Sequence, residues 1–375
     1  MTRNVNAPIA NLTAPTASPR ASADSNKLLG LELIRFLSAF DVLLWHYQHF
    51  AFTMGGNRLQ QPFYSVLRIF YEYGEYGVQM FWCISGFIFF YKYREPIAAK
   101  AVSGWKFFIL RFSRLYPLHF ATLLLVALLQ FIYFHLNDHF FVYFQNNLRH
   151  FALQLAMASN WGLQDGDSFN GPIWSISVEV LIYFFFFLIL RFVGKTLLIN
   201  ILVVAVCIAL EGLRISNPIY ECLKYFYIGG LAAIVLKTEA FAKYRLALSV
   251  VAWCVVCLTP IGIVFFNLFA IKHSGFMFLT FYPPLLLFCA GQNFRVNAPT
   301  QRVIEALGNM TYSSYLIHFP LQLTVAIFFS IIKARIPFDS PAFFAAFMAV
   351  TLIAAYFIYR YFEAPAQNAI RAKFK

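Results

Sequence analysis

Residues 115–136 read LYPLHFATLLLVALLQFIYFHL and contain no Asp, Glu, Lys or Arg. A helix needs about 20 mostly apolar residues to cross the hydrocarbon core of a membrane, and this stretch meets that requirement. With nine comparable stretches, the expected spans are 31–51, 75–91, 115–136, 174–190, 197–212, 219–236, 246–269, 274–291, 312–332 and 341–359. The pattern predicts an all-α fold, a polytopic membrane helical bundle of about ten transmembrane helices.

The composition of the whole chain supports this prediction. Hydrophobic residues make up 61% of the 375 residues and charged residues 12%, whereas soluble domains average about 45–50% and about 25%. A single water-soluble core could not hide so much apolar surface. An ordinary soluble enzyme, a disordered chain and a fibrous protein are therefore excluded.

The net charge of +13 comes from 29 Lys and Arg against 16 Asp and Glu. If the N-terminus is cytoplasmic and ten spans follow, 20 of these cations lie inside and 8 outside, with Arg35 within the first span. Cytoplasmic loops carry excess Lys and Arg, so we expect both termini in the cytoplasm and no nucleic-acid partner. A further span at 148–161 would spoil this asymmetry, and we expect an interfacial or re-entrant helix there.

The domain organisation is simple. We expect a disordered cytoplasmic tail at 1–28, one membrane domain at 29–367 and a short basic cytoplasmic tail at 368–375. The six cysteines all lie in or beside apolar runs, which indicates that they pack as small apolar side chains. Neither a disulfide framework nor a metal site is expected.

The first span contains two ionisable residues on one helical face. His46 lies eleven positions after Arg35, which is about 20° past three full turns and about 16 Å along the axis. We place Arg35 near the cytoplasmic end and His46 in the outer half, with Asp41 off this face and His49 a turn nearer the water. His46 is the candidate general base, because imidazole titrates near neutral pH; the alternative is a buried structural histidine.

Other spans supply further candidates. Glu179 lies in GPIWSISVE at 171–179 and is expected at a membrane depth similar to that of His46. Its carboxylate either orients His46 or pairs with another intramembrane group. Arg111 and Arg114 share a helical face at the cytoplasmic start of the third span, where they either bind phosphate or anchor the span. His318 is expected in the cytoplasmic third of the ninth span.

Ser85-Gly86 is a small pair within a bulky aromatic run. A neighbouring helix or a ligand can approach the backbone closely at such a pair, and helix packing is the simpler interpretation. Ser85 has no base adjacent in sequence, which disfavours a nucleophile there.

Five motifs in order resemble the acyltransferase 3 family of integral membrane O-acyltransferases, over residues 29 to about 367. The motifs are Arg35 and His46 with ten residues between them, FWCISGF at 81–87, RFSRLYP at 111–117, WSISVE at 174–179 and YSSYLIHFP at 312–320. Three positions depart from the family pattern: Leu110, Gln79 and the Glu363-Ala364-Pro365 run.

The resemblance implies a ten-span enzyme of the bacterial inner membrane that needs no metal. It implies transfer of an acyl group, commonly acetyl from acetyl-CoA, to a hydroxyl of a polysaccharide, a lipopolysaccharide or a lipid-linked glycan. The family's essential Arg and His correspond to Arg35 and His46, and its Arg pair to Arg111 and Arg114. The implied partners are acyl-CoA, the sugar acceptor and membrane lipid.

On this interpretation Arg111 and Arg114 hold the CoA phosphates, and Arg35 positions the donor or polarises its carbonyl. His46 takes the proton of the acceptor hydroxyl, and Glu179 orients His46. Whether the acyl group first rests on the protein stays open. The alternatives are a secondary transporter or flippase, disfavoured by the missing inverted repeats, and a catalytically inactive sugar-binding relative.

Overall fold

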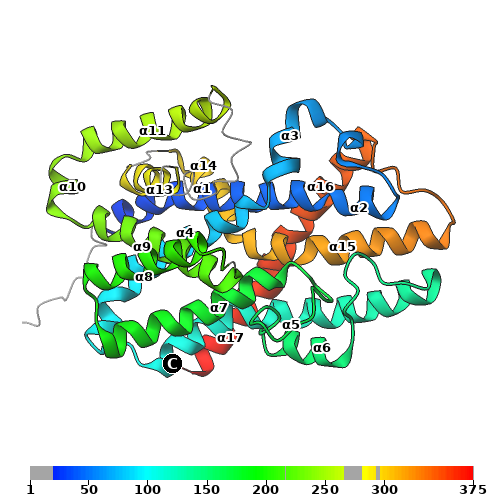
Figure 1. Ribbon diagram of the computed structural model, residues 1–375, viewed down its shortest axis with the longest axis horizontal. Coiled ribbons are helices and arrows are strands. Elements are labelled where there is room, and N and C mark those ends of the chain that lie inside the picture. Colours follow the sequence, from blue (N-terminus) through cyan, green and yellow to red (C-terminus); the bar gives the residue numbers. More distant parts are fainter. Residues whose placement is uncertain (1–19, 216, 266–280, 293–295, 375) are drawn as a thin grey trace, which may run out of the picture.

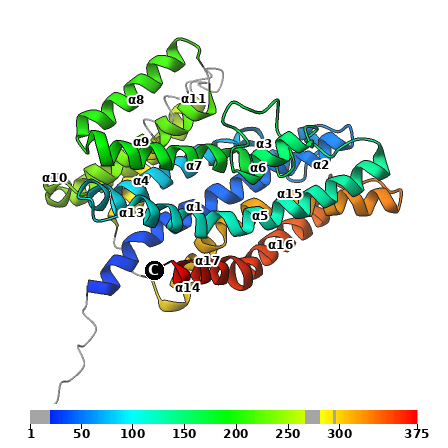
Figure 2. The same ribbon diagram turned by 90° about the horizontal axis from the view of Figure 1, so that it is seen from below.

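The computed structural model describes residues 20–215, 217–265, 281–292 and 296–374, and every regular element among them is helical (Figures 1 and 2). The longer helices are α1 (Arg20–His46), α4 (Tyr76–Ala98), α5 (Gly104–Asn137), α7 (Ile173–Leu188), α8 (Leu197–Gly212), α9 (Pro218–Leu236), α11 (Arg245–Phe265), α15 (Thr311–Ile331) and α16 (Pro341–Ile358). The shorter ones are α2 (Gln48–Thr53), α3 (Tyr64–Tyr73), α6 (Leu148–Leu155), α10 (Glu239–Lys243), α13 (Tyr282–Gly291), α14 (Ala298–Asn309) and α17 (Ala364–Lys373). The single turns are the 3-10 turn η1 (Arg58–Gln60) and the π-helical turns η2 (Ile189–Val193) and η4 (Tyr359–Glu363).

The expected all-helical membrane bundle is confirmed in its general form. Within the described residues, five helical segments are long and apolar enough to cross a membrane: Gly104–Asn137, Ile173–Val193, Pro218–Leu236, Thr311–Ile331 and Pro341–Lys373. The described parts of the other expected spans are helical, with a break at Tyr47 within 31–51, and residues 266–269 and 274–280 of the expected spans lie outside the described residues. The number of spans and the cytoplasmic position of the termini stay predictions.

Both described ends of the chain are helical, and the predicted domain boundaries stay predictions. Residues 1–19 lie outside the described residues, but 20–28 are the helical start of α1. At the other end, residues 368–373 belong to α17, which packs on α5, where the Arg371 Nε donates a hydrogen bond to Ser113 Oγ at 3.1 Å. The two described ends lie at the same end of the bundle (Figures 1 and 2).

Helix α1 runs through the middle of the bundle, with α4, α13, α14 and α15 packed around it (Figure 1). It ends at His46, and α2 begins two residues later at Gln48. The break is fixed by Tyr47, a fully buried residue whose hydroxyl donates to the Phe338 carbonyl at 2.9 Å. His46 therefore lies at a helix end inside the protein.

Helices α4 and α9 touch backbone to backbone. A Cβ atom at Gly86 would overlap the backbone of Phe226, and one at Gly229 would overlap the backbone of Cys83. The close approach expected at Ser85-Gly86 is thus confirmed, and the partner at Gly86 is helix α9. Ser85, one residue earlier, faces a cavity instead.

Segment 170–172, which precedes α7, is bound to the interior of α15. Pro320 has no amide hydrogen, so the carbonyl of Leu316 has no helical partner; the Asn170 Nδ2 donates to it at 3.1 Å. The neighbouring Tyr315 hydroxyl donates to the Pro172 carbonyl at 2.9 Å. Two successive residues of α15 are therefore attached to this segment.

Candidate active site

A cavity lies between α1, α4, α5, α7 and α15 and encloses about 880 Å³ that no protein atom fills, part of it open to solvent. Its charged and hydroxyl-bearing lining residues are Arg35, Ser85, Arg111, Arg114, Ser175, Glu179, Tyr183, Thr311, Tyr312 and Tyr315. The structure therefore brings four of the five predicted site residues to one cavity. The fifth, His46, lies elsewhere. We call this space the arginine cavity.

Arg111 is fixed in place by aromatic rings. Its guanidinium lies 4.6 Å from the ring centre of Phe89 and 5.0 Å from that of Tyr93. Its Nη2 also donates a hydrogen bond to the Tyr93 hydroxyl at 2.7 Å. Such stacking uses the flat face of the guanidinium and leaves hydrogen atoms at its edge for an anion.

Arg114, one helical turn further along α5, has no hydrogen bond or ion pair with any described residue. Its guanidinium lines the cavity beside the more tightly bound Arg111. A group with five donors and no protein acceptor is suited to bind an anionic ligand. Arg114 is therefore the best-placed anion-binding residue of the cavity.

Arg35 joins α1 to the end of α14. Its Nη2 lies 2.6 Å from Glu32 Oε2 and donates to the carbonyl of Gly308. This ion pair fixes the side chain while its guanidinium still lines the cavity. The expected position of Arg35 near the same end as Arg111 and Arg114 agrees with this arrangement.

Glu179 belongs to a hydrogen-bonded chain that the sequence did not reveal. The Tyr183 hydroxyl, one turn along α7, donates to Glu179 Oε1 at 2.6 Å and lies 2.8 Å from Ser85 Oγ on α4. The expected pairing of Glu179 with His46 is corrected here, because no contact among the described residues joins them. Glu179 faces α4, whereas the neighbours of His46 come from α2 and α15.

His46 lies in a cluster of three buried imidazoles. The ring centres of His49 and His318 are 5.0 Å and 4.7 Å from that of His46. His49, expected nearer the water, is buried and bonds through Nδ1 to Gln322 Oε1 at 3.0 Å, while the Gln322 amide donates to the His46 carbonyl at 2.8 Å. His318 lies at the depth of His46.

The hydrogen bond of His46 determines its tautomer. Its Nδ1 lies 3.0 Å from the Val42 carbonyl, which can only accept. Nδ1 therefore carries the hydrogen, and the lone pair of Nε2 is available as a base. Both ring nitrogens of His318 are buried without a hydrogen-bond partner among the described residues. No group of three or more His, Cys, Asp or Glu in this part of the chain is placed to hold a metal ion.

Tyr315 lies between the two parts of the site. Its ring lines the arginine cavity and contacts the His318 ring, with 6.0 Å between the ring centres. Its hydroxyl also bonds to Ser175 Oγ at 2.7 Å. The arginine cavity and the imidazole cluster thus share one wall.

Glu363, in the run that departs from the family pattern, is buried in the π-helical turn η4. It accepts a hydrogen bond of 2.5 Å from Ser313 Oγ on α15, next to the cavity residue Tyr312. It therefore supports the cavity wall from behind.

The acyltransferase 3 family model, described as an acyltransferase domain, matches residues 28–360 of the chain. No curated protein and no solved structure matches the chain.

Proposed function

Since the chain belongs to the acyltransferase 3 family, we propose that this membrane acyltransferase moves an acyl group, normally acetyl, from acyl-CoA to a sugar hydroxyl. The acceptor is a polysaccharide, a lipopolysaccharide or a lipid-linked glycan. The enzyme works in a bacterial inner membrane, with the arginine cavity open toward the cytoplasm.

One observation carries the proposal: three guanidinium groups and a single carboxylate line the arginine cavity. An excess of fixed positive charge in a partly enclosed, apolar space attracts a polyanionic donor. Transporters of neutral sugars have no need of such a site, whereas the diphosphate of CoA matches the forked donors of arginine.

Each arginine has its own part in donor binding. Arg114 binds the CoA diphosphate, since its donors are uncommitted. Arg111, oriented by Tyr93, adds a second guanidinium on the same helical face. Arg35, whose side chain is held by the ion pair with Glu32, polarises the thioester carbonyl in this proposal.

His46 is the general base of the transfer. Its Nε2 takes the proton of the acceptor hydroxyl as the oxygen attacks the thioester carbon. The carbon–sulfur bond then breaks, and the CoA thiolate leaves and recovers the proton from the imidazolium. Because the structure holds Nδ1–H on the Val42 carbonyl, the base nitrogen is defined before the substrate arrives.

Tyr315 belongs to the wall that the arginine cavity shares with the imidazole cluster, so we expect its side chain to move when acyl donor and acceptor meet. Its hydroxyl exchanges its bonds to Ser175 and Pro172 in that movement. Glu179 then acts through Tyr183 on the cavity side, where it orients the Tyr183 and Ser85 hydroxyls toward the acyl group.

The experiment is acyl transfer from radiolabelled acetyl-CoA by inverted membrane vesicles that contain the protein, with glycans of the host as acceptors. We expect alkali-labile label in the glycan fraction with the wild type and none with His46→Ala. The matched control is His135→Ala, which removes an exposed imidazole on α5. Absence of label with the wild type would contradict the proposal.

A further inference from the structure

A second cavity lies between α4, α9, α10, α11 and α13 and contains about 1250 Å³ of unfilled space, part of it open to solvent. These helices lie together in Figure 1, at the end of the molecule opposite α2 and α3. The lining residues are Phe87, Tyr91, Lys92, Leu236, Lys237, Phe241, Ala242, Arg245, Ala290 and Gly291. No part of the mechanism above uses this space.

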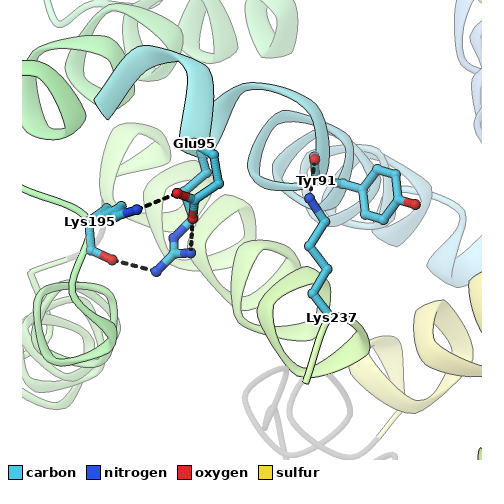
Figure 3. Close-up of polar contacts among 5 residues, drawn as sticks. Tyr91, Glu95, Lys195 and Lys237 are labelled. Carbon is cyan, nitrogen blue, oxygen red and sulfur yellow. Dashed lines mark hydrogen bonds and ion pairs between the residues drawn. The ribbon is translucent and has the colours of Figure 1, made fainter. Parts of the chain in front are cut away.

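The second cavity is strongly cationic. Lys92, Lys237 and Arg245 line it, and its described lining includes no acidic residue. The nearby carboxylate of Glu95 is already paired with Lys195 (Figure 3) and with Arg94 at 2.7 Å. The hydrogen bond from Lys195 lowers the pKa of Glu95, so this carboxylate is ionised and engaged.

The cations are oriented but not neutralised. Lys237 Nζ donates to the Tyr91 carbonyl at 2.6 Å (Figure 3) and keeps two further hydrogens. Arg245 Nε donates to the Gly291 carbonyl at 2.7 Å, and no described residue bonds to its Nη groups. Both side chains are therefore held by neutral carbonyls, which leaves their charge for an anion.

Aromatic rings form another part of the lining. The rings of Phe87 and Tyr91 stack with 6.1 Å between their centres and 8° between their planes. Phe241 contributes a third ring. Flat rings beside cations are the lining that a purine nucleotide requires, because the base stacks and the phosphates pair with the cations.

Helix α4 connects this space to the arginine cavity. Ser85 and Phe89 line the arginine cavity, and Lys92 lines the second one. Positions i, i+4 and i+7 share one helical face, and three residues advance about 4.5 Å along the axis. The two cavities are thus within about one helical turn of each other on α4.

We propose that the second cavity binds the adenosine 3′-phosphate end of CoA, with Lys237 and Arg245 on the 3′-phosphate and Lys92 at the junction with the arginine cavity. The inference rests on acyl-CoA as donor, the proposed function. It divides the donor in two: the diphosphate and the acyl arm enter the arginine cavity, and the nucleotide stays outside it.

The first test compares acetyl-CoA with S-acetyl-pantetheine, which ends before the diphosphate. In Lys237→Gln and Arg245→Gln, we expect the KM for acetyl-CoA to rise about tenfold or more and the KM for S-acetyl-pantetheine to stay unchanged. Lys106→Gln, which removes an exposed cation on α5, is the matched control. An equal change with both donors, or no change with either, would overturn the inference.

The second test does not depend on acyl transfer. Adenosine 3′,5′-bisphosphate is titrated by calorimetry into purified protein in nanodiscs of neutral lipid. We expect binding by the wild type and the control, and at least tenfold weaker binding by both cavity variants. If the wild type does not bind, the inference is wrong. If the substitutions change binding only in nanodiscs that contain anionic lipid, the cavity is a lipid headgroup site and the inference is wrong as well. Binding without acyl transfer would instead count against the proposed function alone.

Discussion

His46 and His318 face each other inside the bundle, with their ring centres 4.7 Å apart. The contact between Arg35 and Gly308 sets the register, because it places α1 and the end of α14 at one level. His46 ends α1, and His318 lies in α15, which begins at Thr311 after the turn at Met310; the packing of these two helices brings the imidazoles together. The ring of His46 therefore belongs to a cluster to which α1, α2 and α15 contribute one imidazole each.

Replacing His46 with Ala is expected to reduce acyl transfer by about 10²-fold to 10⁴-fold, because the general base is lost. The protein should still reach the membrane in normal amount, which immunoblotting of membrane fractions checks. His49 is no suitable control, since it is buried in the same cluster. The exposed His135 serves instead, and a His46→Ala variant with normal product formation would remove the base from this position.

Replacing His318 with Phe keeps a flat ring against His46 but removes both unpartnered nitrogens. If those nitrogens take part in proton transfer, the rate should fall about tenfold or more while the KM for acyl-CoA stays constant. Steady-state kinetics at several acceptor concentrations separates the two parameters. An unchanged rate would show that His318 only packs against His46.

Replacing Arg114 with Lys keeps the charge but loses the fork that binds phosphate. A lost charged hydrogen bond costs about 1.5–3 kcal/mol, so the KM for acetyl-CoA should rise roughly tenfold to hundredfold. Arg111→Lys should show the same rise and also lower thermal stability, because Tyr93 loses its partner. Arg360→Lys, at an exposed site, is the control. If Arg111→Lys and Arg114→Lys both leave the KM for acetyl-CoA unchanged, the two arginines only anchor the span.

Replacing Tyr183 with Phe removes the donor to Glu179 and breaks the chain to Ser85. A buried carboxylate without its donor should cost about 1–3 kcal/mol of stability, and the transfer rate should fall as well. Tyr227→Phe is the matched control, since the Tyr227 hydroxyl is buried without a partner among the described residues. Equal melting temperatures for the two variants would show that the hydrogen bonds among Glu179, Tyr183 and Ser85 do not stabilise the protein.

The predicted sidedness is tested by cysteine labelling. Leu163 and Ala101 are exposed residues on loops expected outside and inside, respectively. In intact spheroplasts, a membrane-impermeant thiol reagent should label Leu163→Cys and leave Ala101→Cys unlabelled, with the wild type as background. The reverse labelling pattern would show that the arginine cavity opens away from the cytoplasm, where CoA is found.

The helices could be predicted because apolar runs of span length are visible along the chain. The relation between Glu179 and its partners could not, because α7 is apolar on nearly all sides and its pattern does not say which face turns to α4. Similar depth in the membrane therefore does not bring Glu179 and His46 together. Glu179 and Tyr183 are four residues apart, so their contact on one helix can be predicted from the sequence. The contact with Ser85 cannot, because it depends on how α7 packs against α4.

The attachment of segment 170–172 to α15 limits how such an enzyme can diversify. Asn170 bonds to Leu316 beside Tyr315, and Pro172 bonds to Tyr315 itself, so a shift of this segment also moves the wall between the arginine cavity and the imidazole cluster. A side chain on Gly171 would also strike the ring of Tyr143. Adaptation to new acceptors should therefore spare this segment and Tyr143, which packs against Gly171.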